Sequence, residues 1–168
     1  MARIRGASEP RVEPAAHPTA DEHVETIPLS HRDLVECPPV AALTTVMPDG
    51  QPQTSVVWCD FDGALVQVNT MRGFRKERNM RANPRVTVLC YDPRQTLRYL
   101  EIRGTVVDMS EEGALEHLDA LSSKYAKRPV RYFGDMIPAD FAETEVPVLC
   151  RIMPIRVVAR DWTAGSAT

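Results

Sequence analysis

The sequence of 168 residues lacks long hydrophobic runs. No segment approaches the roughly 18 to 20 consecutive apolar residues that a membrane-spanning helix requires. The first 30 residues contain no apolar stretch of the kind found in a secretory signal peptide. We therefore expect a cytoplasmic protein with no membrane partner.

Closely spaced metal ligands and nucleophile motifs are also missing. Cys37, Cys59, Cys90 and Cys150 stand far apart, and no C-x-x-C, H-x-x-x-H or G-x-S-x-G motif is present. A structural zinc site uses paired ligands at short spacing, whereas isolated cysteines in apolar runs are typical of small buried residues in a reducing compartment. We expect no metal and no catalytic side chain, so that any chemistry comes from a bound cofactor.

The sequence also lacks an excess of positive charge and has few aromatic residues. The formal net charge is −3, and the chain contains four Tyr, four Phe and two Trp. A nucleic-acid-binding surface needs an excess of positive charge and, for single strands, aromatic side chains that stack on bases. We therefore expect no nucleic-acid partner.

The N-terminal residues differ in composition from the rest of the chain. Residues 1–28 contain four prolines and eight charged residues without aliphatic periodicity. Such a segment buries too little apolar area to offset the entropy lost on ordering. The sequence predicts a flexible N-terminal arm over 1–28 and one domain over 29–168, a length that supports a single core.

Six β-strands are predicted in the domain. The β-branched residues and turn signals of residues 40–70 predict three antiparallel strands at 40–47, 53–61 and 64–70, joined by Pro48-Asp49-Gly50 and Asp62-Gly63. Further strands are expected at 85–91, at 98–109 with a bend at Gly104, and at 146–159.

Helices are predicted at 31–36, 73–83 and 110–127. The third has an apolar stripe at helical spacing, and we expect His117 on its solvent-facing side. Strands joined mostly by turns, with a few helices, favour a mainly β fold: a six-stranded antiparallel barrel with helices at its mouths.

A basic segment is the strongest candidate for a binding site. It begins at Thr70, where a predicted strand ends and a helix begins, and between Arg72 and Arg85 it holds six cations against one acid, Glu77. The N-terminus of a helix offers unpaired N–H groups and the positive end of a dipole. The segment therefore predicts a phosphate or carboxylate site, and a solvated basic helix face is the alternative.

Aromatic residues offer two further candidates. Trp58 shares one face of its predicted strand with Thr54 and Val56, and a tryptophan in mid-strand is more often part of a core than of a ligand site. The loop over 126–147 holds candidate ring contacts for an acceptor, and packing of the loop onto the barrel is their more ordinary role: Tyr132, Phe133 and Phe141.

Three segments in this order carry a family resemblance: ALTTVMPDGQPQTSVVWCDFDG, NTMRGFRKERNMRANPRVTVL and RYLEIRGTV. Over about residues 30–162 the chain resembles the split-barrel flavin and deazaflavin oxidoreductases of the pyridoxamine 5'-phosphate oxidase-like superfamily. It is most similar to the actinobacterial branch of probable coenzyme F420-dependent enzymes. The resemblance implies an FMN-binding split-barrel fold and an obligate-type homodimer with the cofactor in a groove between subunits.

The same resemblance implies a set of cofactor-binding residues. Thr70 at the end of the third strand, with Arg75 and Lys76 at the start of the next helix, would hold a phosphate. The ring system would lie along the second strand at Ser55, Val56, Val57 and Trp58. The neighbouring positions in the family correspond to Asn69, Arg72 and Asn79.

Two features favour the deazaflavin over FMN. FMN-using oxidases of this superfamily carry an Arg and a Lys on the second strand, where this sequence has Ser55 and Trp58. Coenzyme F420 is a long polyanion that suits a basic helix. We expect an F420-dependent reductase that transfers a hydride to a small conjugated acceptor, whose identity the sequence leaves open. The alternatives are an FMN-binding oxidoreductase of the same fold, or a non-enzymatic split-barrel protein that binds a tetrapyrrole or another anion.

Overall fold

The computed structural model describes residues 24–36 and 40–162. Most of the predicted arm, residues 1–23, lies outside the described residues. Residues 24–28 lie along the last strand of the sheet, where the amide of Glu25 donates to the carbonyl oxygen of Pro154 at 3.2 Å. Ile27 is only 2% exposed and belongs to the hydrophobic core.

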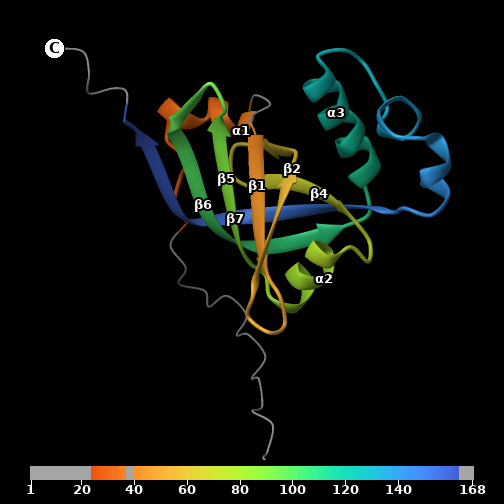
Figure 1. Ribbon diagram of the computed structural model, residues 1–168, viewed down its shortest axis with the longest axis horizontal. Coiled ribbons are helices and arrows are strands. Elements are labelled where there is room, and N and C mark those ends of the chain that lie inside the picture. Colours follow the sequence, from red (N-terminus) through yellow and green to blue (C-terminus); the bar gives the residue numbers. More distant parts are fainter. Residues whose placement is uncertain (1–23, 37–39, 163–168) are drawn as a thin grey trace, which may run out of the picture.

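One curled antiparallel sheet of seven strands forms the body of the molecule (Figure 1). The strands are β1 (Val40–Val46), β2 (Pro52–Val57), β3 (Cys59–Phe61), β4 (Val66–Met71), β5 (Arg85–Asp92), β6 (Gln95–Ser110) and β7 (Pro147–Asp161). Their spatial order is β2-β1-β5-β6-β7-β4-β3. The prediction of a mainly β, antiparallel fold is confirmed.

The predicted count of six strands is wrong because the second predicted strand is broken at Trp58. Residues before the break pair with β1, and residues after it pair with β4 at the other edge of the sheet. The chain therefore passes at Trp58 from one edge strand of the sheet, β2, to the other edge strand, β3. Trp58 marks the corner of the half-barrel.

Short helices surround the curled sheet. They are α1 (Asp33–Glu36), which follows the 3-10 turn η1 (Leu29–His31), α2 (Arg75–Ala82), α3 (Ala114–Ala126), and the helical turns η2 (Tyr132–Met136) and η3 (Ala139–Glu143). Figure 1 shows α1 near one end of the sheet, α2 near the opposite end, and α3 with the segment after it to one side. No helix of the described residues is both long and apolar enough to cross a membrane.

The core lies inside the curl of the sheet. The strands contribute fully buried aliphatic side chains, and α1 closes one end of the curl with Leu34 and Val35. The strand residues at its centre are Leu43, Val68, Val88, Ile102 and Ile152. This apolar burial supplies most of the driving force for the fold.

The predicted bend at Gly104 is confirmed. The register between β6 and β7 shifts between Arg103 and Gly104. A Cβ atom at position 104 would lie 2.6 Å from the Cγ2 of Ile152 and 2.6 Å from the carbonyl oxygen of Met153. Only glycine permits this approach of the two strands, and the irregularity bends the sheet.

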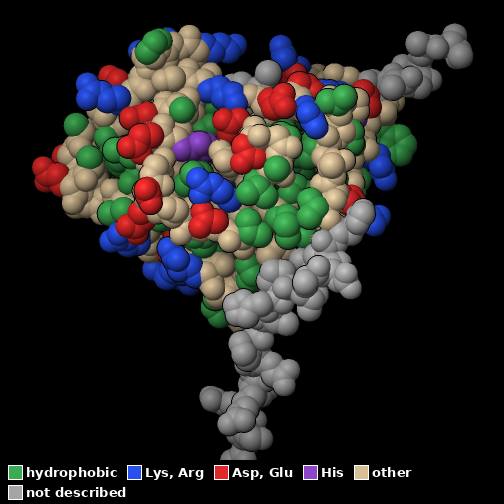
Figure 2. Space-filling view, turned by 180° about the vertical axis from the view of Figure 1, so that it is seen from behind, with side chains coloured by type: hydrophobic (Ala, Val, Ile, Leu, Met, Phe, Trp, Pro, Cys, Tyr) green, Lys and Arg blue, Asp and Glu red, His purple; other side chains and the backbone are tan. Residues whose placement is uncertain are grey.

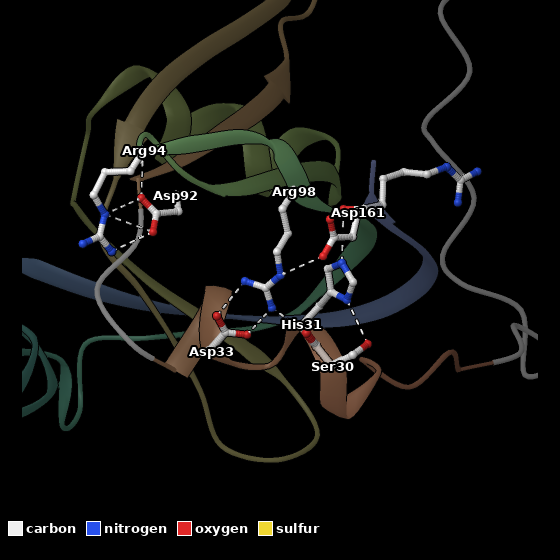
Figure 3. A network of polar contacts seen from close by, with 8 residues as sticks. Ser30, His31, Asp33, Asp92, Arg94, Arg98 and Asp161 are labelled. Carbon is white, nitrogen blue, oxygen red and sulfur yellow. Dashed lines mark hydrogen bonds and ion pairs between the residues drawn. The ribbon is translucent and has the colours of Figure 1, made fainter. Parts of the chain in front are cut away.

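A polar network ties α1 to the ends of β6 and β7 (Figure 3). The guanidinium of Arg98 donates to both carboxylate oxygens of Asp33, at 2.8 and 2.6 Å, and lies 3.8 Å from the carboxylate of Asp161. The Nε2 of His31 lies 3.2 Å from the carbonyl oxygen of Arg160. The network fixes the short N-terminal helix, which has few hydrogen bonds of its own.

Charge is mixed on the rear surface of the molecule. Figure 2 shows hydrophobic side chains gathered in one area of this face, while acidic and basic side chains are interspersed over other parts of it. A face of this kind creates no strong field of a single sign.

Candidate functional site

A groove of about 230 Å³ lies where the end of β2, the strand β4 and the helices α2 and α3 meet. We call it the Trp58 groove. Its lining residues are Val56, Val57, Trp58, Asn69, Thr70, Met71, Phe74, Lys76, Leu118 and Tyr132. Six of the ten predicted site residues are among them: Val56, Val57, Trp58, Asn69, Thr70 and Lys76. The lining does not include Ser55, Arg72, Arg75 or Asn79.

Aromatic rings form one wall of the Trp58 groove. Trp58 is half-buried and stacks on Tyr125 with ring centroids 5.0 Å apart, and Tyr132 meets it edge-on at 6.1 Å. The core role that we favoured for Trp58 is therefore wrong, because the strand break turns its ring outward into the groove wall. Phe133 packs edge-on against Tyr132 at 5.1 Å, whereas Phe141 is 43% exposed.

The lining of the groove also includes two groups that suit an anion. Lys76 is half-buried, and burial lowers the pKa of its ammonium group. No carboxylate of the described residues lies within ion-pair distance of Lys76, and the Oγ1 of Thr70 is buried without a hydrogen-bond partner. A buried polar group without a partner costs about 1–3 kcal/mol, and a phosphate or carboxylate would satisfy both groups.

Acidic partners neutralise part of the predicted basic segment. Arg72 forms an ion pair with Glu111, which follows β6. Glu77 is 3% exposed, pairs with Arg81, and accepts the amide N–H of Gly73 at 3.1 Å. Among the described residues, four of the six cations have no acidic partner: Arg75, Lys76, Arg78 and Arg85. The segment is therefore less cationic than its composition indicates.

Asn79 lies in the protein interior and not in the Trp58 groove. It is 1% exposed, and its side-chain amide donates to the Oγ1 of Thr45 at 3.0 Å. Thr45 belongs to β1, so this hydrogen bond fixes α2 on the sheet. The other predicted residues outside the lining are the exposed Arg72 and Arg75 and the partly buried Ser55, whose Oγ has no hydrogen-bond partner.

His117 was missed as a residue of the site. The prediction of a solvent-facing side chain is wrong: His117 is half-buried, and its Nδ1 lies 2.6 Å from the Nδ2 of Asn69 in the groove wall. Burial lowers the pKa of the imidazole. The Nε2 of His117 and the Oδ1 of Asn69 are both buried without hydrogen-bond partners. His117 is adjacent to Leu118, which belongs to the apolar stripe of α3. A prediction that extended the buried face of this helix by one residue on that side would have included His117.

The described cysteines lie in the core. Cys59, Cys90 and Cys150 are buried, with the sulfur atoms of the first two 3.9 Å apart, and Cys37 lies outside the described residues. Within residues 24–36 and 40–162, no group of three or more His, Cys, Asp or Glu side chains is placed to hold a metal ion.

The sequence also matches a known family. The family model described as pyridoxamine 5'-phosphate oxidase matches residues 27–147. The chain belongs to the pyridoxamine 5'-phosphate oxidase family. The predicted resemblance is thereby confirmed, and this family places the chain among oxidoreductases of the flavin and deazaflavin type.

Solved structures that are similar to the chain include an F420 reductase with 31% sequence identity. The match has a TM-score of 0.67 and covers 79% of this chain and 98% of the reductase. A conserved hypothetical protein from Mycobacterium tuberculosis is 23% identical, with a TM-score of 0.65 and coverage of 91% of this chain and 94% of that one.

A putative pyridoxamine 5'-phosphate oxidase from Listeria innocua is 21% identical, with a TM-score of 0.51 and coverage of 72% and 87%. This structure and the mycobacterial one support the fold alone. No protein of curated function matches the sequence.

Proposed function

We propose that the protein is a coenzyme F420-dependent reductase that transfers a hydride to a small conjugated acceptor. The observation that carries the proposal is the Trp58 groove, whose lining combines an unpaired ammonium group and a buried hydroxyl without a partner with aromatic side chains. The likeness to an F420 reductase at 31% identity supports the same cofactor.

The residues of the groove fit a cofactor that combines a flat ring with a phosphate. Lys76 and Thr70 would hold the phosphate, since its oxygens can accept one hydrogen bond from the ammonium group and another from the hydroxyl. Trp58 and Val56 would contact the ring system. The exposed Arg75 and Arg78 on α2 lie next to this end of the groove in sequence and would attract the anionic tail of a deazaflavin.

When bound, the coenzyme supplies the hydride, so that no side chain needs to act as a nucleophile. The chain's own residues would orient donor and acceptor and exclude water from the space between them. The pair formed by Trp58 and Tyr132 provides an apolar wall for this purpose. Asn69 contributes a polar side chain to the lining of the groove, where it contacts His117 of α3.

The open side of the groove favours a homodimer. Val56 lines the groove and is nevertheless 73% exposed. A large apolar side chain with this exposure suits an interface. We propose that a second protomer covers the groove at Val56 and completes the cofactor site.

A comparative titration tests the cofactor. The purified protein is titrated with coenzyme F420 and with FMN at about 0.05 and 0.2 M salt, because phosphate contacts by cations weaken as salt rises. We expect F420 to bind more tightly than FMN and to bind more weakly at the higher salt concentration. Preference for FMN, or binding of neither cofactor, would contradict the proposal.

The variant Lys76→Ala tests the residue that is proposed to hold the phosphate. Loss of one charge-assisted hydrogen bond of about 1.5–3 kcal/mol predicts binding that is weaker by about tenfold or more, and the loss should shrink as salt rises. The matched control is Arg94→Ala at the β5–β6 turn, an exposed cation whose loss should leave the affinity unchanged. Equal affinity of Lys76→Ala and the parent protein at low salt would remove Lys76 from the site.

A further inference from the structure

A second groove lies on the outer face of the sheet, where β1, β5 and β6 run side by side. It has a volume of about 330 Å³, and its lining includes Arg85, Arg103, Thr44 and Thr87. We call it the Arg103 groove. It shares no lining residue with the Trp58 groove.

Three arginines from three neighbouring strands point to this outer face. Along a strand, successive side chains lie on opposite faces of the sheet. In each case an adjacent residue packs in or against the core: Val86 beside Arg85, Ile102 beside Arg103 and Val157 beside Arg156. The three guanidinium groups are therefore on the same side of the sheet, away from the core.

The register of the strands brings these arginines together. Arg103 of β6 lies directly opposite Arg156 of β7 on one side and opposite Thr87 of β5 on the other. Directly opposite residues have Cβ atoms roughly 4.5–5.5 Å apart, and diagonal neighbours about 7–8 Å. Arg85 is two residues from Thr87 and is thus the diagonal neighbour of Arg103.

Acidic side chains balance only part of this positive charge. Glu101 pairs with Arg103 at 2.5 Å, and the carboxylate of Glu25 accepts the amide N–H of Val157 at 2.6 Å. Among the residues that the structure describes, neither Arg85 nor Arg156 has an acidic side chain within ion-pair distance. Like charges directly opposite one another in a sheet are destabilising, and Glu101 offsets this charge only at Arg103.

The bend at Gly104 helps to form the hollow beside these arginines. Gly104 and Ile155 both line the groove at the point where the register between β6 and β7 shifts. Such an irregularity bends the strands and turns neighbouring side chains in a new direction. The positive charge therefore borders a concave surface.

We propose that the Arg103 groove binds a multivalent anion that carries phosphate or carboxylate groups, through Arg85, Arg103 and Arg156. A guanidinium group offers a planar fork of donors that matches both kinds of oxyanion. The half-buried hydroxyl of Thr87 provides a further donor in the groove. Binding would relieve the repulsion between the opposed arginines.

Thermal unfolding of the full chain tests this site. The midpoint is measured with increasing inorganic phosphate, citrate or chloride at constant ionic strength, since a ligand that binds only the folded state raises the midpoint. We expect phosphate, citrate or both to raise it above the chloride value, and the more effective anion identifies the class of ligand. Equal midpoints in all three salts would overturn the proposal.

The variant Arg156→Gln should raise the unfolding midpoint without anion and lower the affinity for the anion. Loss of an arginine with a purely structural role would not produce both effects. Without anion at low salt, the midpoint should rise because the repulsion from Arg103 is removed. The apparent affinity for the anion should fall by about tenfold or more. Arg85→Gln, on another strand, should weaken binding in the same direction, and the exposed Arg94→Gln should leave binding unchanged.

Two results with the variants would overturn the proposal. One is anion binding by Arg156→Gln and Arg85→Gln that equals binding by the parent protein. The other is loss of the anion effect in Lys76→Ala while Arg156→Gln retains it, because the anion would then bind in the Trp58 groove.

Discussion

The neutral ring of His117 can accept a hydrogen bond from the Asn69 amide in the wall of the Trp58 groove, and protonation removes this acceptor. With the Nδ2 of Asn69 as the donor, the Nδ1 of His117 is the acceptor and the proton of the neutral ring lies on Nε2. Burial favours this neutral form and lowers the pKa, with a smaller opposing effect from Asp60. The nearby cations Arg151 and Lys124 lower the pKa further.

The lowered pKa of His117 predicts a loss of stability in mild acid. The unfolded chain binds a proton near the ordinary value of 6.5, whereas the folded protein binds it only at lower pH. The stabilising contribution is therefore fully present above about pH 6.5 and is lost as the pH falls through the pKa of the folded state. The slope is at most about 1.4 kcal/mol per pH unit for one proton.

Urea unfolding of the parent protein and His117→Gln, from about pH 8 to about pH 5, measures this contribution. We expect the variant to lose stability less steeply than the parent below about pH 6.5. A control variant at the buried His31, His31→Gln, keeps the imidazole at position 117 and should retain the parent's slope from that group. Identical slopes for His117→Gln and the parent would show that His117 does not titrate differently in the folded state.

At the scale of an element, α1 depends on tertiary contacts. It has four residues, and isolated helices of this length are unstable in water. Its own Leu34 and Val35 are buried against the sheet. The guanidinium of Arg98 donates hydrogen bonds to Asp33 of the helix and to the carbonyl oxygen of Ser30. The helix therefore exists because the end of the curled sheet provides both an apolar surface and a cation.

Arg98→Ala should loosen α1 more than it affects the rest of the sheet. The guanidinium of Arg98 is 17% exposed, and loss of its charged hydrogen bonds should lower the free energy of unfolding by about 1–3 kcal/mol. Hydrogen exchange of residues 29–36 should become faster than in the parent protein, while exchange in β5 should change less. Arg94→Ala removes a neighbouring exposed cation of Figure 3 and should leave α1 protected; equal loosening by both variants would contradict the assigned role of Arg98.

Arg98 also gives α1 a dependence on acid. Its hydrogen bonds to Asp33 hold the pKa of that carboxyl below its ordinary value of 3.8. The contribution of the pair is therefore present above this pH and is lost as the pH falls through the lower pKa of the folded state.

At the scale of the whole molecule, the proposal makes the site part of a homodimer. Val56 at the edge of the Trp58 groove is 73% exposed, and a partner protomer would bury it. Val56→Asp places a charge there, which is costly in an interface and tolerable on a free surface. We expect this variant to shift the mass measured by light scattering from dimer towards monomer and to weaken F420 binding.

Leu97→Asp offers a control for Val56→Asp. Leu97 is also an exposed apolar residue, 58% exposed, but it lies at the start of β6 and does not line the groove. Cofactor binding by this variant should match that of the parent protein. A monomeric parent protein, or a Val56→Asp variant that remains dimeric and binds the cofactor normally, would count against the shared site.

Local chemistry explains how much of the fold and the site could be predicted. The alternation of buried and partly buried residues in β1, the turn at Gly50 and the bend at Gly104 follow from side-chain period and backbone sterics, which are properties of short segments. The strand break at Trp58 arises because β2 pairs with β1 whereas β3 pairs with β4, so no local sequence pattern predicts it. The pairing of Arg72 with Glu111 likewise joins residues 39 apart.

The sequence by itself determined the antiparallel, mainly β class, the family, and the placement of Thr70 at the end of a strand with Lys76 at the start of the helix that follows. These features depend on neighbours in the chain and on the order of segments. The tertiary structure alone decided which cations are neutralised, which face His117 occupies, and that three arginines of neighbouring strands lie on one face of the sheet. Burial and strand register set these properties, and both arise only when distant segments pack together.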